Sequence, residues 1–201
     1  ICDGVRKDAQ SSVRDAQKAG IQVVMMTGDG AQTAAAVAGK CGILTEGGVC
    51  ISGDVLRAMS DSEVTDLIPR LNVVSRALPS DKLRLVELAK SAGLVAGMTG
   101  DGVNDAPSLC AADVGFAMGS GSEVASAASD IVILDSSLRS IVNAVLFGRT
   151  IFKSIRKFIT FQLIMNLCAT AVSFIGPFIG IDAPVTVVQM LWINMIMDTL
   201  G

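Results

Sequence analysis

The sequence Met-Thr-Gly-Asp-Gly-Val-Asn-Asp-Ala-Pro, residues 98–107, decides the fold. The apolar run at residues 93–98, which starts with a glycine, predicts a buried strand. Asp105, followed by alanine and proline, is typical of a helix N-cap with a proline in the first turn. We therefore expect a loop at the carboxyl end of a strand, where open α/β sheets build their sites.

This loop carries two carboxylates, Asp101 and Asp105. They would suit phosphate-bound Mg²⁺, a hard cation that prefers oxygen ligands. Gly100 and Gly102 allow the backbone to turn sharply and to approach a ligand closely. A glycine-rich turn with one capping aspartate would explain one acid and not both, so a phosphate and magnesium site is the better interpretation.

Residues 99–107 resemble the hinge motif of P-type ATPases, ion pumps with a haloacid-dehalogenase-like phosphorylation domain. The resemblance covers essentially the whole chain and implies a partial doubly wound, Rossmann-like α/β domain followed by a transmembrane helical hairpin. It implies that Asp101 and Asp105 form the Mg²⁺ site, with Asp105 also supporting the loop. It further implies that Asn104 contacts the phosphoryl group.

A second loop repeats the arrangement of strand, loop and helix. The apolar residues 21–26 predict a buried strand, Thr-Gly-Asp-Gly follows at residues 27–30, and an alanine-rich helix is expected to about Lys40. A hydroxyl and free backbone N–H groups at a helix N-terminus suit an anion. The family resemblance implies that Thr27 and Gly28 hold the phosphoryl group and that Asp29 contacts the nucleotide.

Lys82 is a third candidate site residue. Ser80 predicts the N-cap of a helix that runs to about Ala92, and a lysine so early opposes the helix dipole and needs a compensating anion. A surface lysine balanced by Asp81 is the alternative. Pro-x-x-Lys, residues 79–82, resembles the pump motif whose lysine neutralises an aspartyl phosphate.

Arg6 follows Asp-Gly-Val, which aligns with a loop that leads from the nucleotide-binding domain into the phosphorylation domain of the pumps. The resemblance implies a phosphate or nucleotide contact for Arg6. A solvated surface arginine is the alternative interpretation.

The rest of the first 137 residues alternates between predicted strands and helices, which favours a mainly parallel sheet. We expect helices at residues 8–19, 54–71 and 121–129, the second ended early by Pro69. We expect strands at 72–76, 113–119 and 131–134, and a glycine-rich connection at 41–53.

Charge divides the chain. None of its 16 Lys and Arg residues follows Lys157, and residues 158–181 carry no charge, which exceeds the roughly 20 residues that span a bilayer. The positive-inside rule places the basic end of this span in the cytosol. The net charge of −3 offers no basic surface for nucleic acid, and a chain without histidine is a poor zinc ligand set.

We therefore expect a partial phosphorylation domain at residues 1–137, a helical stalk at 138–157, and two transmembrane helices at 158–201, the second truncated. The first residue is isoleucine, which suggests an internal piece of a longer protein. The family's phosphorylated aspartate lies in an Asp-Lys-Thr-Gly motif that this sequence lacks. We expect the isolated chain to be inactive, poorly stable and without one central strand of its sheet.

Asn194 and Asp198 lie on one face of the second predicted span, and a carboxylate inside a membrane is costly and by default functional. A position near the interface or a structural pairing of Asp198 is the alternative. The two spans resemble the fifth and sixth transmembrane helices of calcium pumps, which implies that Asn166, Asn194 and Asp198 bind transported Ca²⁺. Ala169 and Met197 replace ligands of the two-site pumps and resemble the plasma-membrane type.

The resemblance thus implies part of an integral, plasma-membrane pump that exports cytosolic Ca²⁺ with ATP and Mg²⁺ through an aspartyl-phosphate. Its partners would be the lipid bilayer and the missing N-terminal parts of the same pump. Three alternatives stay open: a soluble dehalogenase-like phosphatase, a pump for H⁺, Na⁺ or K⁺, and an inactive membrane fragment that binds partners.

Overall fold

The computed structural model of the 201-residue chain describes residues 6, 8–180 and 186–200, without the side chains of residues 187 and 198–200. The chain forms two compact units, Ile1–Ala144 and Val145–Gly201. The division falls within the long helix α8, inside the segment that the sequence predicts as a stalk.

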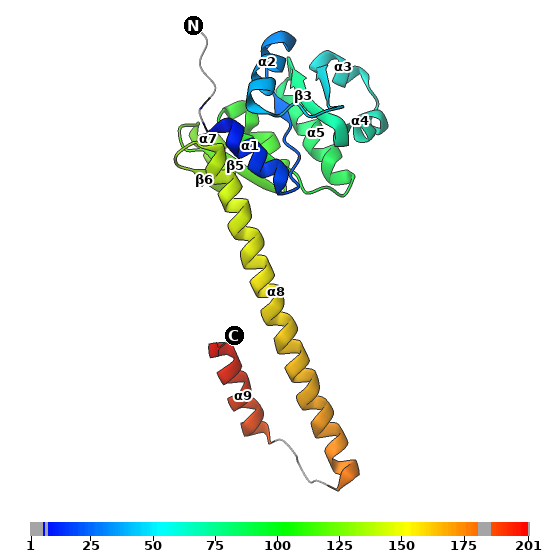
Figure 1. Ribbon diagram of the computed structural model, residues 1–201, viewed down its shortest axis with the longest axis vertical. Coiled ribbons are helices and arrows are strands. Elements are labelled where there is room, and N and C mark those ends of the chain that lie inside the picture. The colour runs from blue at the N-terminus through cyan, green and yellow to red at the C-terminus, as the bar shows by residue number, and fades with distance from the viewer. Residues whose placement is uncertain (1–5, 7, 181–185, 201) are drawn as a thin grey trace. The chain divides into compact units, whose positions relative to one another are not determined.

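The first unit alternates strands and helices (Figure 1). Its strands are β1 (Met25–Met26), β2 (Val49–Ser52), β3 (Leu71–Ser75), β4 (Gly97–Gly100), β5 (Val114–Met118) and β6 (Ile131–Ile133). Its helices are α1 (Ala9–Lys18), α2 (Ala31–Cys41), α3 (Gly53–Ala58), α4 (Asp61–Leu67), α5 (Pro79–Ser91), α6 (Ala106–Ala111) and α7 (Glu123–Ala127), with short 3₁₀ turns η1 (Ile68–Arg70) and η2 (Val103–Asp105).

The strands form two separate parallel sheets, in the orders β1-β3-β2 and β4-β5-β6. In the first, Met26 pairs with Val74; in the second, Thr99 pairs with Phe116. Within the described residues, β1 and β4 each pair on one side only, so both are edge strands. The parallel pairing confirms the α/β class. Both strands that lead into the candidate loops have an open edge, as β2 and β6 do on the other side of each sheet.

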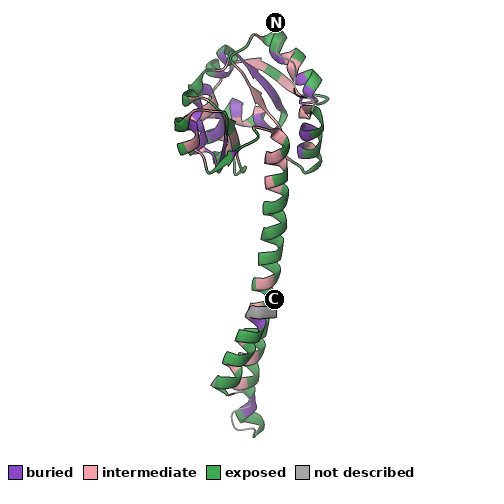
Figure 2. Ribbon diagram, turned by 90° about the vertical axis from the view of Figure 1, so that its left-hand side faces the viewer, coloured by how far each residue is buried: buried purple, intermediate pink, exposed green. Residues whose placement is uncertain are grey.

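Each sheet has its own apolar core. Around the first sheet, Val73 packs with Val13 and Ala38 from α1 and α2, and Val74 packs with Leu56 and Leu85 from α3 and α5. Around the second, Ala117 packs with buried residues of α6 and α7. Figure 2 shows these buried residues inside the first unit. The central strand β3 is buried at all five positions, as expected of a parallel strand covered on both faces.

The two strands predicted before the loops are shorter and less buried than expected. Strand β4 covers only Gly97–Gly100, and Val95 before it is 86% exposed. Strand β1 covers only Met25–Met26, while Gln22 donates hydrogen bonds to the carbonyls of Ile68 and Leu71. The prediction of buried strands was wrong because each lies at a sheet edge, where one side lacks a neighbour.

The single helix predicted at residues 54–71 was also wrong. The segment forms α3 and α4, separated where Ser60 caps α4: its hydroxyl accepts from the Glu63 N–H at 3.4 Å and Glu63 Oε2 accepts from the Ser60 N–H at 2.7 Å. This Ser-x-x-Glu capping box marks the start of a helix, and the prediction did not take it into account. The connection predicted at residues 41–53 contains strand β2. This strand has only four residues, too few for an alternation of apolar and polar residues to indicate it.

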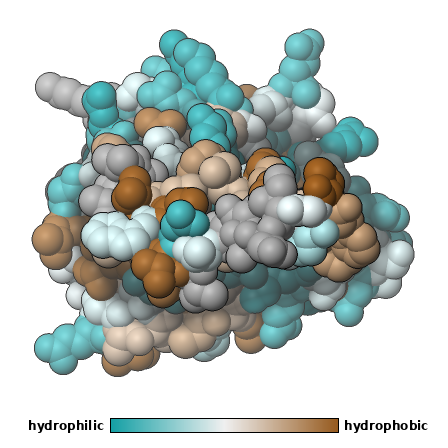
Figure 3. Space-filling model, turned by 90° about the horizontal axis from the view of Figure 1, so that it is seen from below, coloured by the Kyte–Doolittle hydropathy of each residue, from teal (hydrophilic) through white to brown (hydrophobic). Residues whose placement is uncertain are grey.

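The second unit contains most of α8 (Leu138–Ile175), the turn η3 (Gly176–Ile179) and α9 (Val187–Leu200). Among the described residues, one helical stretch, Leu138–Ile179, is long and apolar enough to cross a membrane. Its large apolar side chains are mostly exposed, as Figure 2 shows along α8. The space-filling view shows hydrophobic residues at the surface among hydrophilic ones (Figure 3). An exposed apolar surface of this kind needs a bilayer or other helices to cover it.

Candidate phosphate and cation sites

Asp105 organises the loop that follows β4. Its carboxylate is buried, and its Oδ2 accepts hydrogen bonds from the backbone N–H groups of Asp101 and Gly102 at 3.3 and 3.4 Å. A Cβ on Gly100 would lie 2.5 Å from the Asp105 Cβ, so only glycine fits there. The carboxylate folds back over its own loop; no side-chain cap for α6 is present at this residue.

Lys82 reaches this loop from α5. Its Nζ lies 2.7 Å from Asp105 Oδ1, and both side chains are largely buried, with 22% and 9% exposed. The predicted compensating anion for Lys82 is therefore Asp105, and the alternative pairing with Asp81 is absent because Asp81 binds Arg57 and the Leu78 N–H. The predicted N-cap Ser80 was wrong: Leu78 is the N-cap and Pro79 takes the first helical position.

The loop after β1 is tied to the segment before α5. Thr27 donates its N–H to the Val74 carbonyl and accepts from the Ala77 N–H, at 3.0 and 2.9 Å. Its hydroxyl donates to Asp29 Oδ2 and accepts from the Asp29 N–H, both at 3.1 Å. The Thr27 loop and the first turn of α5, which carries Lys82, are therefore held together at the carboxyl end of the first sheet.

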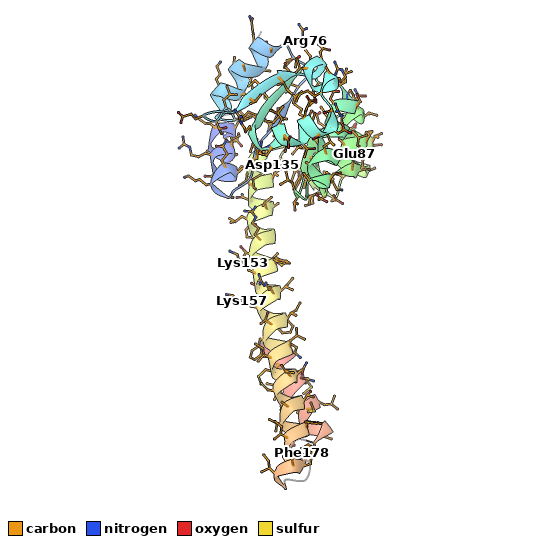
Figure 4. The ribbon with its side chains drawn as sticks, turned by 90° about the vertical axis from the view of Figure 1, so that its right-hand side faces the viewer. Arg76, Glu87, Asp135, Lys153, Lys157 and Phe178 are labelled. Carbon is orange, nitrogen blue, oxygen red and sulfur yellow. The ribbon has the colours of Figure 1, made fainter. Side chains whose placement is uncertain are left out.

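Arg76 lies between these two segments in an unusual conformation. Its φ angle is +51°, in the left-handed region that residues other than glycine adopt at a cost. Its N–H donates to the Asp29 carbonyl at 2.9 Å, and its side chain is exposed (Figure 4). Strained backbone is common at functional sites. No sequence signal pointed to Arg76, because its residue type does not indicate this conformation.

The residues present fit a Mg²⁺ site only in part. Asp101 is exposed at the mouth of the loop, as is Asn104, whereas both carboxylate oxygens of Asp105 bond to the protein. Within the described residues, no group of three or more acidic, cysteine or histidine side chains is placed to hold a metal. Asp101 can supply one ligand, and direct ligation by Asp105 stays a prediction.

Arg6 lies at another part of the first unit. Its guanidinium donates to the Ser136 carbonyl at 2.6 Å, beside a hydrogen bond of 2.8 Å from the Ser137 hydroxyl to Asp8. That bond lowers the pKa of the Asp8 carboxyl from its ordinary value. The contacts join the start of α1 to the turn between β6 and α8. Arg6 is bonded at this turn, and its phosphate or nucleotide contact stays a prediction.

Asn166 of α8 and Asn194 of α9 lie near each other in the second unit. They line one small gap between α8 and α9, of about 10 Å³, together with Ala169 and Met197. These are four of the positions that the sequence analysis singled out. The side chain of Asp198 lies outside the described residues. Two atoms of α8, Gln162 Oε1 and Ser173 Oγ, are buried without a hydrogen-bond partner among the residues described.

Basic residues gather on α8 before its uncharged part. Arg156 and Lys157 line an open hollow with Thr160, Phe161 and Ile164. Lys153 and Lys157, four residues apart, lie on the same side of the helix (Figure 4). This placement suits the edge of a membrane, where lysine and arginine carry their charge into the headgroup region.

The chain is similar to known proteins along its whole length. A family model described as haloacid dehalogenase-like hydrolase matches residues 1–113. The chain is 46% identical over 202 residues to the plasma-membrane-type calcium-transporting ATPase 4 of Arabidopsis thaliana, and 44% identical over 226 residues to a calcium-transporting ATPase of Dictyostelium discoideum. Both matches cover the whole chain and 20% of the relative, so the chain spans about a fifth of these proteins.

Two solved structures of transporting ATPases are also similar to this chain. One structure of a zinc-transporting PIB-type ATPase matches with a TM-score of 0.68 and 27% identity, over 98% of this chain and 26% of that one. A second structure of a zinc-transporting PIB-type ATPase, solved in a different state, matches with a TM-score of 0.66 and 29% identity, over 87% of this chain and 24% of the other. The likeness extends through both units.

Proposed function

We propose that this chain, which belongs to the haloacid dehalogenase-like hydrolase family, is part of a plasma-membrane-type calcium-transporting P-type ATPase. The whole protein would export Ca²⁺ from the cytosol at the expense of ATP. The observation that carries the proposal is the meeting of Lys82 with the Asp101–Asp105 loop, because it joins the two halves of a phosphate site. The calcium-transporting relatives, similar over the whole chain, support the choice of pump.

The proposed chemistry is phosphoryl transfer from ATP to an aspartate and then to water. The bond between the γ-phosphorus and the bridging oxygen breaks, ADP leaves, and the aspartyl-phosphate is later hydrolysed. The transferred group carries its charge on its outer oxygens, so catalysis depends mainly on positioning and neutralisation. Lys82 would neutralise that charge, while Thr27, Gly28 and Asn104 would donate hydrogen bonds to it and Asp29 would contact the nucleotide.

Mg²⁺, when bound, would shield the phosphate oxygens, with Asp101 as its ligand from this chain. Asp105 would act by holding the Asp101 N–H and the Lys82 ammonium in place. The phosphorylated aspartate would come from a part of the pump outside this sequence, since no Asp-Lys-Thr-Gly motif occurs here. The open edges of β1 and β4 are where a further parallel strand could pair.

The proposed calcium site lies between α8 and α9. Asn166 and Asn194 would contribute amide oxygens and Asp198 a carboxylate, and the remaining oxygens that Ca²⁺ needs would come from helices outside this chain. Ala169 and Met197 leave this gap with few oxygens, which supports one transported ion per cycle.

The test is Asp198→Asn in the full-length protein, with Cys168→Ser as the matched control, because Cys168 is exposed on α8 outside the gap. We expect Asp198→Asn to abolish Ca²⁺-activated phosphorylation by ATP and to retain phosphorylation by inorganic phosphate. The control should retain both. Unchanged activation by Ca²⁺ would exclude the calcium site, and activation by H⁺, Na⁺, K⁺ or Zn²⁺ instead would identify a pump for another cation.

A further inference from the structure

An ion pair between α3 and α5 lies directly beside Lys82. Asp81 is 2% exposed, and its Oδ2 accepts from the Arg57 guanidinium of α3 and, at 2.9 Å, from the backbone N–H of Leu78. The second bond caps the start of α5. Arg57 also donates to Asp54 at 2.5 Å, which orients its guanidinium toward α5.

A second set of hydrogen bonds joins the same segments, and here the arginine belongs to α5. Arg84 of α5 donates to the carbonyls of Leu56 and Met59, each at 2.7 Å, and to Asp61 Oδ1 at 2.6 Å. The end of α3 and the start of α4 are therefore bound to α5 on both sides of Lys82 in the sequence. Five hydrogen bonds from planar guanidinium groups would resist sliding or rotation of α5.

The packing beside this ion pair leaves no room for a side chain at Gly53. A Cβ on Gly53, the first residue of α3, would lie 2.5 Å from the Arg76 carbonyl oxygen and 2.8 Å from Asp81 Oδ2. The carbonyl oxygen of Arg76, the residue with the strained backbone, therefore lies beside Gly53 together with the Arg57–Asp81 ion pair. The turn before α3 and the turn before α5 are pressed together at the carboxyl end of the first sheet.

We propose that Asp81 and Arg57 are positioning residues that act through Lys82. Consecutive residues project about 100° apart around a helix, so Asp81 can bind α3 while Lys82 reaches Asp105. The first turn of α5 is then fixed from two directions, which sets where the ammonium meets the phosphoryl group. This inference rests on the proposed function, since it takes Lys82 as the group that neutralises that charge.

The test measures binding of orthovanadate, a phosphate analogue, to the full-length protein carrying Asp81→Asn, Lys82→Ala or both. In the protein that retains Lys82, we expect Asp81→Asn to weaken vanadate binding about tenfold, because displacement of the Lys82 ammonium from the bound anion is costly. In the Lys82→Ala background the same substitution should change binding little, because the residue through which it acts is gone. Arg57→Lys, which keeps a positive charge beside Asp81 but not the guanidinium, should bind vanadate more tightly than Arg57→Gln and less tightly than the unchanged protein.

The matched control is Lys90→Gln on the same helix. Lys90 lies eight residues after Lys82 and pairs with Asp113 at 3.4 Å, so its loss also removes an ion pair of α5. It should lower thermal stability without changing vanadate affinity. If Asp81→Asn does not fold, Arg57→Gln serves in its place, since Arg57 is 35% exposed.

The outcomes separate the two claims. One outcome is that Lys82→Ala weakens vanadate binding, whereas Asp81→Asn and Arg57→Gln leave it unchanged. This result would overturn the positioning role and leave the proposed function in place. Equal losses from Asp81→Asn with and without Lys82 would also overturn it. Unchanged binding in Lys82→Ala would refute the phosphate role of Lys82 itself.

Discussion

The ammonium of Lys82 lies 2.7 Å from Oδ1 of Asp105, while Oδ2 of the same carboxylate holds the backbone of Asp101. One buried side chain thus sets the distance between a cation on α5 and an acid on the loop after β4. The two carboxylates of the loop therefore have different environments, and the proposed phosphoryl and Mg²⁺ site would need both a cation and an acid close together.

This difference predicts different effects for the two aspartates. Asp105→Asn should leave Lys82 without its anion in a partly buried place and lower stability by about 3 kcal/mol. Asp101→Asn should change stability little, because Asp101 is exposed, but should raise the Mg²⁺ concentration needed for phosphorylation. Thermal unfolding and Mg²⁺ titration of the two full-length variants distinguish these effects. Equal loss of stability in both would contradict the separate roles.

Gly121 should tolerate no side chain. A Cβ there would lie 2.7 Å from the Asp101 carbonyl oxygen and 2.9 Å from its Cα, so Gly121→Ala should displace the loop and cost about 1–3 kcal/mol. Gly39→Ala is the control, because the nearest atom to its Cβ is 3.8 Å away and alanine favours the helix interior. A thermal midpoint that falls for Gly121→Ala and holds or rises for Gly39→Ala is the expected result.

Arg76 provides a test of backbone strain. Glycine adopts a φ angle of +51° readily, whereas alanine keeps the clash of Cβ with the backbone. Both substitutions remove the same exposed side chain, so Arg76→Gly should be more stable than Arg76→Ala by about 1 kcal/mol. Thermal unfolding of the two variants measures this difference, and the reverse order would show that the conformation is not strained.

The capping box of α4 predicts a pH effect. A hydrogen bond from the backbone N–H of Ser60 and, with a smaller effect, one from its hydroxyl lower the pKa of the Glu63 carboxyl below its ordinary value of 4.5. The folded state therefore favours the carboxylate: its contribution is complete above the ordinary pKa and is lost as the pH falls through the lowered one. Comparison with Glu63→Gln should show a stability difference at neutral pH that disappears on acidification. A difference that persists in acid would exclude the carboxylate as its source.

Much of the first unit could be predicted from the sequence because local signals agree with the fold. The helix expected to run to about Ala92 is α5, which ends at Ser91 although its predicted N-cap was wrong, and α8 begins at the predicted Leu138. The two candidate loops were located by short glycine-containing motifs after apolar runs, and their binding of phosphate stays a prediction. Such motifs depend on neighbouring residues alone, so the sequence is sufficient to locate them.

Other features depend on contacts across the fold and had no local signal. Asp81 reads as an ordinary helix-start acid, and its ion pair with Arg57 exists only because α3 packs against α5. The strands β1 and β4 were expected to be buried, but burial depends on neighbours on both sides. The pairing of Lys82 with Asp105 rather than Asp81 was likewise decided by tertiary packing.

The most direct measurement is transfer of the labelled γ-phosphate of ATP to the full-length protein in the presence and absence of Ca²⁺. We expect an acid-stable label that appears only with Ca²⁺ and that hydroxylamine removes, as is typical of an aspartyl-phosphate. A label that forms equally without Ca²⁺, or one that resists hydroxylamine, would contradict a calcium pump that works through this site.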